Sequence, residues 1–108
     1  MPELIKCIKE IIDREYTNPA LSIKTLSSRF NFSRRNRKML GAKYREMYGC
    51  TITERINELR IGEAKRLINQ SELPISWVRV FSGYSTRTYF WYMFKKSEGT
   101  SPGKYRAG

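Results

Sequence analysis

The chain contains no histidine, and its only cysteines are Cys7 and Cys50. These absences exclude a Cys/His metal cage and a histidine-based general acid or base. The serine, threonine and glutamate residues group no nucleophile with a base, so we expect neither an enzyme nor a bound metal or other cofactor. Cys7 falls in an apolar helical pattern and is expected to be a small core residue, whereas Cys50 follows Gly49 in a turn.

Long hydrophobic runs are also missing. No apolar run reaches the length that a membrane-spanning helix needs, and the N-terminus lacks the hydrophobic region of a signal peptide. Two thiols without a secretory signal favour a reducing compartment. We therefore expect a cytoplasmic protein with no membrane partner.

Negative charge is scarce. Ten acidic residues, among which Asp13 is the only aspartate, stand against 21 lysines and arginines, which gives a net charge of +11. This balance favours a polyanionic partner, nucleic acid before an anionic membrane surface, although a merely solvated basic surface is the alternative. The 108 residues, 40% hydrophobic, suit one compact domain or two very small subdomains.

The apolar residues repeat with helical periods throughout, so we expect an all-α fold. The first segment carries one stripe: Leu4, Ile5, Ile8, Ile11 and Ile12. Asn18-Pro19 ends that helix, Ser22 caps a short one, and Pro74 opens another. A long central helix runs from about Thr53, its expected N-cap, to Asn69. Its stripe comprises Ile56, Leu59, Ala64, Leu67 and Ile68.

The chain contains an internal repeat. Residues 21–33 (LSIKTLSSRFNFS) match residues 73–85 (LPISWVRVFSGYS), and residues 40–49 match residues 90–99. Asn31 pairs with Gly83, and both residue types tolerate the positive φ that a tight interhelical turn needs. Ser33 pairs with Ser85 as a capping residue, and each copy ends in glycine. Gly99 is the expected left-handed C-cap of the second copy. Chance similarity of two amphipathic hairpins is the alternative to two helix-turn-helix units.

The two copies differ at one junction. Ser33 stands seven residues before Leu40, but Ser85 stands five before Phe90. The longer junction, SRRNRKML, either extends the following helix or forms a basic loop. We divide the chain into a first helix-turn-helix subdomain (1–52), a linker helix (53–70) and a second helix-turn-helix subdomain (71–108).

A helical wheel for the stretch YFWYMF, within residues 83–96, separates its rings. The core side is expected to hold Tyr89, Phe90, Met93 and Phe94. The outward side then carries Thr88, Trp91, Tyr92 and Lys95, with Arg87 at its border. The alternative for Trp91 is packing on the central helix. An exposed aromatic pair on a basic face indicates a binding surface.

Such a face suits the major groove of DNA, where arginine pairs with guanine. The first copy presents Lys38, Gly41, Ala42 and Arg45 on its outward face. The expected base contacts of the second copy are Arg87, Thr88, Trp91 and Tyr92, whereas Gly41 and Ala42 offer little to a base edge. The expected phosphate contacts are Arg34, Arg35, Arg37, Arg45, Lys95 and Lys96.

The segment PISWVRVFSGYSTRTYFWYMFKKSEGTSPGKYR resembles the C-terminal signature of the AraC/XylS family of bacterial transcription regulators. The residues that fit it are Ile75, Val78, Gly83, Tyr84, Tyr89, Phe90, Phe94, Lys95, Lys96, Gly99, Ser101, Pro102, Tyr105 and Arg106. ERINELRIGEAKRLI is similar to the family's linker helix, and LSIKTLSSRFNFS to its first helix-turn-helix. The resemblance implies seven helices, with two recognition helices entering successive major-groove segments of promoter DNA at the bacterial nucleoid. If the longer junction is treated as an insertion, the family's base-contact positions match Lys38, Gly41 and Ala42 in the first copy, and we expect Lys38 and Ala42 to contact bases. The resemblance further implies an activator that binds DNA as a monomer and contacts RNA polymerase.

The sequence departs from the family pattern in four places. Arg79 replaces a usual alanine, Tyr92 replaces a frequent arginine, Gly41 and Ala42 replace larger polar residues, and the basic junction is longer. Two other functions stay open. One is a non-specific nucleic-acid-coating or architectural protein, which Gly41, Ala42 and the charge would suit; the other is an interaction module that inhibits other regulators.

Overall fold

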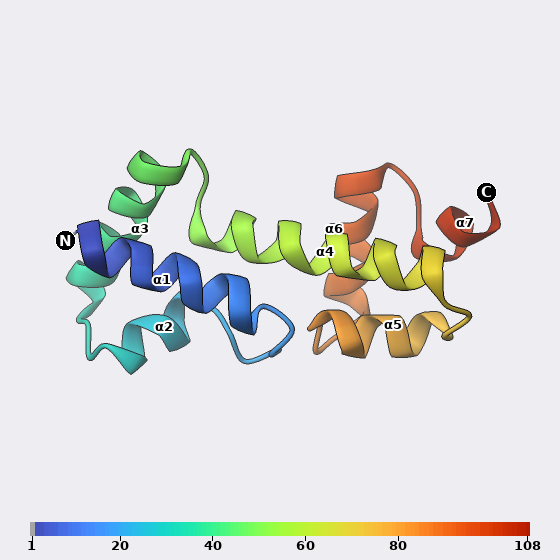
Figure 1. Ribbon diagram of the computed structural model, residues 1–108, viewed down its shortest axis with the longest axis horizontal. Coiled ribbons are helices and arrows are strands. Elements are labelled where there is room, and N and C mark those ends of the chain that lie inside the picture. The colour runs from blue at the N-terminus through green and yellow to red at the C-terminus, as the bar shows by residue number, and fades with distance from the viewer. Residues whose placement is uncertain (1) are drawn as a thin grey trace. The chain divides into compact units, whose positions relative to one another are not determined.

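The computed structural model describes residues 2–108, and within them the secondary structure consists of seven helices and no strand (Figure 1). The helices are α1 (Pro2–Glu15), α2 (Ile23–Arg29), α3 (Arg34–Tyr48), α4 (Ile52–Gln70), α5 (Ile75–Ser82), α6 (Arg87–Glu98) and α7 (Pro102–Ala107). The predicted all-α, seven-helix architecture is confirmed. None of these helices is both long enough and apolar enough to cross a membrane.

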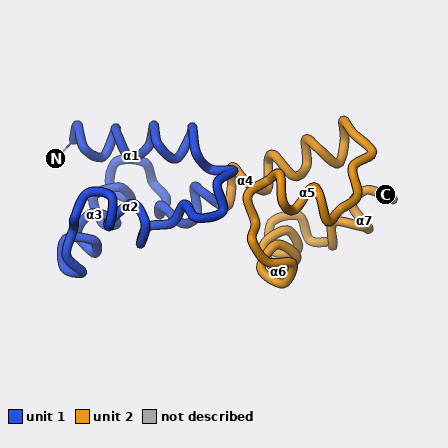
Figure 2. Tube along the Cα trace, turned by 90° about the horizontal axis from the view of Figure 1, so that it is seen from below, with its two compact units in different colours: residues 1–56 blue, residues 57–108 orange. Residues whose placement is uncertain are grey.

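The chain forms two compact units, drawn in different colours in Figure 2. Unit 1 ends at Ile56 and unit 2 begins at Asn57. The division falls inside α4, so this helix contributes its first turn to unit 1 and the remainder to unit 2. Each unit contains one short helix followed by one longer helix, α2–α3 in unit 1 and α5–α6 in unit 2.

Unit 1 is built around the apolar stripe of α1. Its buried apolar residues are Ile5, Ile8, Ile11 and Ile12 from α1, Leu21 from the segment before α2, Leu26 from α2, Leu40 and Tyr44 from α3, and Ile52 and Ile56 from α4. The prediction that Cys7 belongs to this core is wrong, because its side chain is exposed. Cys7 lies two residues after Ile5, about 200° around the helix, and this turns it away from the stripe.

Unit 2 has a separate core of aliphatic and aromatic side chains. It comprises Ile61, Ala64, Ile68, Val78, Tyr84, Phe90 and Phe94. Within the predicted stripe of α4, Leu59 and Leu67 are only half-buried, whereas Ile61, outside that stripe, is 3% exposed. The buried face therefore does not follow one apolar stripe along α4, because the N-terminal end of the helix packs in unit 1 and the remainder packs in unit 2.

A polar network lies beside this second core. The Tyr84 hydroxyl donates to Asn57 Oδ1 at 2.7 Å, and Asn57 Nδ2 donates to the Tyr89 hydroxyl at 3.0 Å. The Arg60 guanidinium lies over the Tyr84 ring, 5.6 Å from its centroid. Burial lowers the pKa of Arg60, and the nearby phenols of Tyr84 and Tyr89 oppose that shift. Hydrogen bonding of this kind is what makes buried polar groups tolerable.

The helix starts follow ordinary capping chemistry, with two corrections to the sequence expectations. Ser22 caps α2 as predicted. Thr51, not Thr53, caps α4: its hydroxyl accepts the Glu54 N–H at 3.0 Å, while the Glu54 carboxylate accepts the Thr51 N–H at 2.9 Å. This reciprocal pair satisfies two free backbone donors at once, which Thr53 could not do. In the second repeat Thr86, not Ser85, caps α6.

The turn between the helices of each repeat has the predicted backbone. Asn31 has φ 57° and Gly83 has φ 104°, so both lie in the left-handed region. Gly49 and Gly99 end α3 and α6 with φ of 78° and 80°. The two repeats therefore share one construction, from the interhelical turn to the terminal glycine.

Candidate nucleic-acid interface

The basic junction of the first repeat is helical. Ser33 caps α3 by accepting the Asn36 N–H at 3.2 Å, so Arg34 is already the first helical residue. Counted back from the C-caps, Leu40 and Phe90 stand at the same position, yet α3 has 15 residues and α6 has 12. The three additional residues form about one extra turn at the N-terminus of α3. Of the two forms left open by the sequence, the structure therefore has the extended helix.

The outer face of α3 borders an open basic groove. Its volume is about 560 Å³, and its lining comprises Ile23, Arg34, Arg37, Lys38, Gly41, Ala42, Arg45, Thr51, Ile52 and Thr53. Arg34, Lys38, Ala42 and Arg45 are exposed, while Arg37 and Gly41 are half-buried. Arg35 is exposed but lies outside the lining. Four cationic side chains thus surround a floor that is partly apolar.

The outer face of α6 combines cations with rings. Arg87, Thr88, Tyr92, Lys95 and Lys96 are exposed. Tyr92 has 61% of its surface exposed, which confirms its predicted outward orientation. The Lys96 ammonium lies 6.0 Å from the centroid of the Tyr92 ring.

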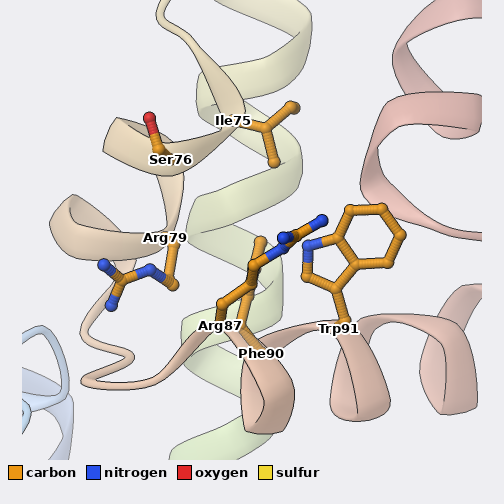
Figure 3. Close-up of a pocket in the computed structure, with 6 residues that line it drawn as sticks. All are labelled: Ile75, Ser76, Arg79, Arg87, Phe90 and Trp91. Atoms are coloured by element: carbon orange, nitrogen blue, oxygen red, sulfur yellow. The ribbon is translucent and has the colours of Figure 1, made fainter.

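A smaller slot lies between α5 and α6. Its volume is about 350 Å³, and Ile75, Ser76, Arg79, Arg87, Phe90 and Trp91 line it (Figure 3). Figure 3 shows the Arg87 guanidinium reaching toward the indole of Trp91, and its Cζ lies 5.1 Å from the ring centroid. The Arg79 guanidinium points the other way, where it donates to the Tyr84 carbonyl at 2.8 Å. Arg79, one of the departures from the family pattern, therefore fastens the turn that precedes α6.

Two aromatic predictions on α6 need correction. Tyr89, expected on the core side, is 41% exposed; its hydroxyl reaches Asn57 and its ring lies 5.8 Å from that of Tyr84. Trp91, expected to face outward, is half-buried and packs against the core of unit 2, to which α4 contributes three residues. The buried face of α6 therefore extends toward Trp91 and away from Tyr89, compared with the face that the helical wheel predicts.

Several acidic residues pair with cations other than those proposed for DNA contact. The ion pairs join Asp13 to Lys9 and Arg55, Glu15 to Arg29, Glu46 to Lys43, Glu63 to Arg66, and Glu98 to Lys65. The Ser97 hydroxyl and then Lys65 lower the pKa of Glu98, and burial opposes them. Within residues 2–108 no carboxylate forms an ion pair with the cations proposed for DNA contact. Their charge is thus available to an external anion.

The contact between Arg87 and Trp91 was not predicted from the sequence. The spacing of the two residues indicates it, because residues four apart lie on the same side of a helix. The helical wheel places Trp91 on the outward side and Arg87 at its border, and the prediction treats them as separate DNA contacts.

Comparisons with known proteins agree with this geometry. A family model described as a helix-turn-helix domain matches residues 20–108. The probable transcription factor PqrA of Proteus vulgaris is 23% identical over 104 residues, which cover 96% of this chain and 80% of that protein. The arabinose operon regulatory protein of Escherichia coli is 34% identical over 65 residues, or 60% of this chain and 22% of that protein. This chain belongs to the AraC/XylS family of transcription regulators.

The solved structures show the same architecture. The C-terminal domain of AraT, a response regulator from Geobacillus stearothermophilus, superposes with a TM-score of 0.84 at 25% identity, covering 95% of this chain and 83% of that one. The chain is accordingly a sequence-specific DNA-binding regulator of transcription. It spans most of PqrA but less than a quarter of the arabinose regulator.

Proposed function

We propose that this AraC/XylS-family chain activates transcription by placing α3 and α6 in successive major-groove segments of promoter DNA. The observation that carries the proposal is the paired construction of the two units, each with a capped recognition helix. Within residues 2–108 the cations of these helices that we assign to DNA contact form no ion pair with a carboxylate. An α-helix fits the major groove, and Lys and Arg side chains neutralise the flanking phosphates.

In unit 2 we assign base contacts to Arg87, Thr88, Trp91 and Tyr92. Arg87 lies in the first turn of α6, the part of a recognition helix that approaches base edges. Its guanidinium can donate two hydrogen bonds to guanine O6 and N7, and Thr88 can bond a base edge or contact a thymine methyl. Lys95 and Lys96, in the last turn, are assigned to phosphates.

In unit 1 the base contacts are assigned to Lys38 and Ala42. Arg34, Arg35, Arg37 and Arg45 are assigned to phosphates. Gly41 and Ala42 offer little to a base edge but allow the helix to approach closely, while the extra turn of α3 adds two exposed arginines. Unit 1 would therefore contribute mainly affinity, and unit 2 would contribute most of the sequence discrimination.

The remaining parts of the proposal concern organisation and setting. Residues 53–70 of α4 act as the linker between a first subdomain (1–52) and a second (71–108). The chain binds DNA as a monomer in the bacterial cytoplasm, contacts RNA polymerase and carries out no catalysis. Family membership and the two non-identical recognition helices within one chain support these points.

Selection of bound duplexes from a random DNA pool tests this function. We expect one enriched site, and binding to it should survive excess non-cognate duplex. Binding that any competitor removes would instead favour the non-specific coating protein. Weak binding that moderate salt abolishes would favour the interaction module.

A further inference from the structure

Arg87 does not extend freely from α6. Its Cζ lies 5.1 Å from the centre of the Trp91 ring, within the range of a cation–π contact (Figure 3). Trp91 is itself held, because it is half-buried against the core of unit 2. A ring fixed by packing therefore restricts the directions that the arginine side chain can take.

This contact leaves the hydrogen-bonding capacity of Arg87 intact. A guanidinium is planar, and its five N–H donors lie in the plane, pointing outward from its edges. The cation–π contact with Trp91 uses no hydrogen-bond acceptor, so these donors stay free for the two acceptors of guanine. Part of the side-chain entropy that base binding would cost is already lost in the free protein.

The first repeat has the arginine but not the ring. Counted back from the C-caps, Arg37 and Gly41 stand where Arg87 and Trp91 stand in α6. No aromatic side chain is among the residues that line the groove beside Arg37, and the groove is larger than the slot of unit 2, about 560 Å³ against 350 Å³. No ring therefore fixes the direction of the Arg37 guanidinium, and this suits a phosphate contact better than a bidentate base contact.

We propose that Trp91 is the positioning residue for Arg87: its ring is a platform that holds the guanidinium in place. The presence of this platform in α6 and its absence from α3 decide which of the two arginines, Arg87 or Arg37, reads a base. The inference rests on the proposed role of Arg87 in reading a guanine. It changes the role of Trp91, which acts mainly through Arg87 and not through a base contact of its own.

The first test removes the platform. Trp91→Leu keeps an apolar side chain for packing but has no ring. Trp91→Phe keeps a ring, but its cation–π contact is weaker than that of an indole. On the selected duplex we expect Trp91→Leu to weaken binding about two- to fivefold, and Trp91→Phe to weaken it less. Two controls remove the base contact of Arg87. In each of them, a duplex with 7-deazaguanine at the position that Arg87 reads and, separately, an Arg87→Ala background, Trp91→Leu should cause no additional loss of affinity.

The second test builds the platform in unit 1. A Cβ at Gly41 would meet only Ile23 Cδ1, at an ordinary 3.6 Å, and the open groove leaves space for a larger side chain. Gly41→Trp should create a new guanine preference in the half-site of unit 1, and adding Arg37→Ala should remove it. Gly41→Ala, the matched control, should create none. Unchanged preferences in Gly41→Trp would refute the claim that the missing ring sets the role of Arg37.

The outcomes separate this inference from the function beneath it. If Arg87→Ala leaves every base preference intact, the assigned role of Arg87 fails and the positioning role fails with it. If Arg87→Ala loses a guanine preference while Trp91→Leu retains full affinity, only the positioning role fails. A cost of Trp91→Leu that persists without Arg87 would show a direct base contact and would also overturn it. Circular dichroism verifies the fold of each variant, and Trp91→Met replaces Trp91→Leu if the latter does not fold.

Discussion

At the scale of single residues, Arg87 combines exposure, a position in the first turn of α6 and freedom from any ion pair within the described chain. Arg87→Ala should cost about 1–3 kcal/mol on the cognate duplex and relax the preference at one base pair. Random DNA should be affected far less. Arg66→Ala removes an exposed cation that pairs with Glu63 on α4 and serves as the control. Equal losses on all sequences would identify Arg87 as a phosphate contact.

Tyr84 tests the buried polar network of unit 2. It is 2% exposed, and its hydroxyl donates to Asn57 Oδ1. Because the hydroxyl is buried together with its acceptor, Tyr84→Phe should lower the free energy of unfolding by about 1–3 kcal/mol. Tyr92→Phe removes a hydroxyl from a side chain that is 61% exposed and should change stability by less than about 0.5 kcal/mol. Denaturant titration of both variants measures the difference, and similar values would mean that the network adds nothing.

At the scale of helices, the extra turn of α3 is unusual in its charge. Its first turn holds no acidic residue, and Arg34, Arg35 and Arg37 lie near the positive end of the helix dipole. Changing these three arginines to alanine should weaken cognate and random DNA alike, and should flatten the slope of log K against log salt by about 0.9 for each lost phosphate contact. The same change should leave stability equal or higher, because it removes cations from a helix N-terminus.

A charge-preserving variant is the control for this prediction. Arg34→Lys, Arg35→Lys and Arg37→Lys keep the charge and should keep the salt slope. A full slope in the alanine variant would show that the extra turn does not touch DNA.

The helices also show which features a sequence can and cannot predict. Turns and ends were predictable where one residue decides them, as at Asn31, Gly83 and Gly99, because positive φ restricts the choice of residue. The state of the basic junction depended on whether the Ser33 cap could start the helix one turn early, and residue spacing alone does not decide that. The sequence therefore predicts the positions of positive-φ turns better than it predicts the residue at which a helix begins.

The arrangement of Tyr89 and Trp91 was not predictable for a different reason. A helical wheel gives the direction of each side chain but not how far a neighbouring helix covers it. In unit 2 the core extends over Trp91, while Tyr89 stays at the edge and is bound through its hydroxyl. The composition of the candidate interface followed from the sequence, whereas the contact between Arg87 and Trp91 required the fold.

At the scale of the whole molecule, each unit buries a phenol that alkaline pH would ionise. Burial, followed by the negative charge of the Cys50 thiolate, raises the pKa of Tyr44 to about 12, and burial raises the pKa of Tyr84 further. A pKa higher in the folded state than in the unfolded state means that the neutral form stabilises the fold. Their contribution to stability should be complete below about pH 10, the pKa of an unfolded tyrosine, and should be lost as pH rises through 12.

Circular dichroism against pH measures this alkaline transition. Tyr44→Phe should make stability less dependent on pH within that window, because phenylalanine has no proton to lose. Every other titratable group is the same in both proteins, so the difference between them reports on Tyr44. An identical pH dependence in the variant and the parent would rule out a contribution from Tyr44.

The two recognition faces differ in chemistry, and this difference determines what the DNA site should look like. Gly41 and Ala42 occupy the positions that Trp91 and Tyr92 occupy in the second unit, so the two half-sites should differ in sequence. We expect one 12.8 kDa chain per duplex and protection of two major-groove segments about one helical turn, ~10 bp, apart. Hydroxyl-radical footprinting measures the protected segments, and sedimentation of the complex measures the number of chains per duplex.

Inverting one half-site should abolish tight binding, because the unit that faces it would then meet a sequence it does not match. A symmetric footprint that requires two chains would contradict this arrangement, and a duplex with both half-sites in their selected orientation is the control.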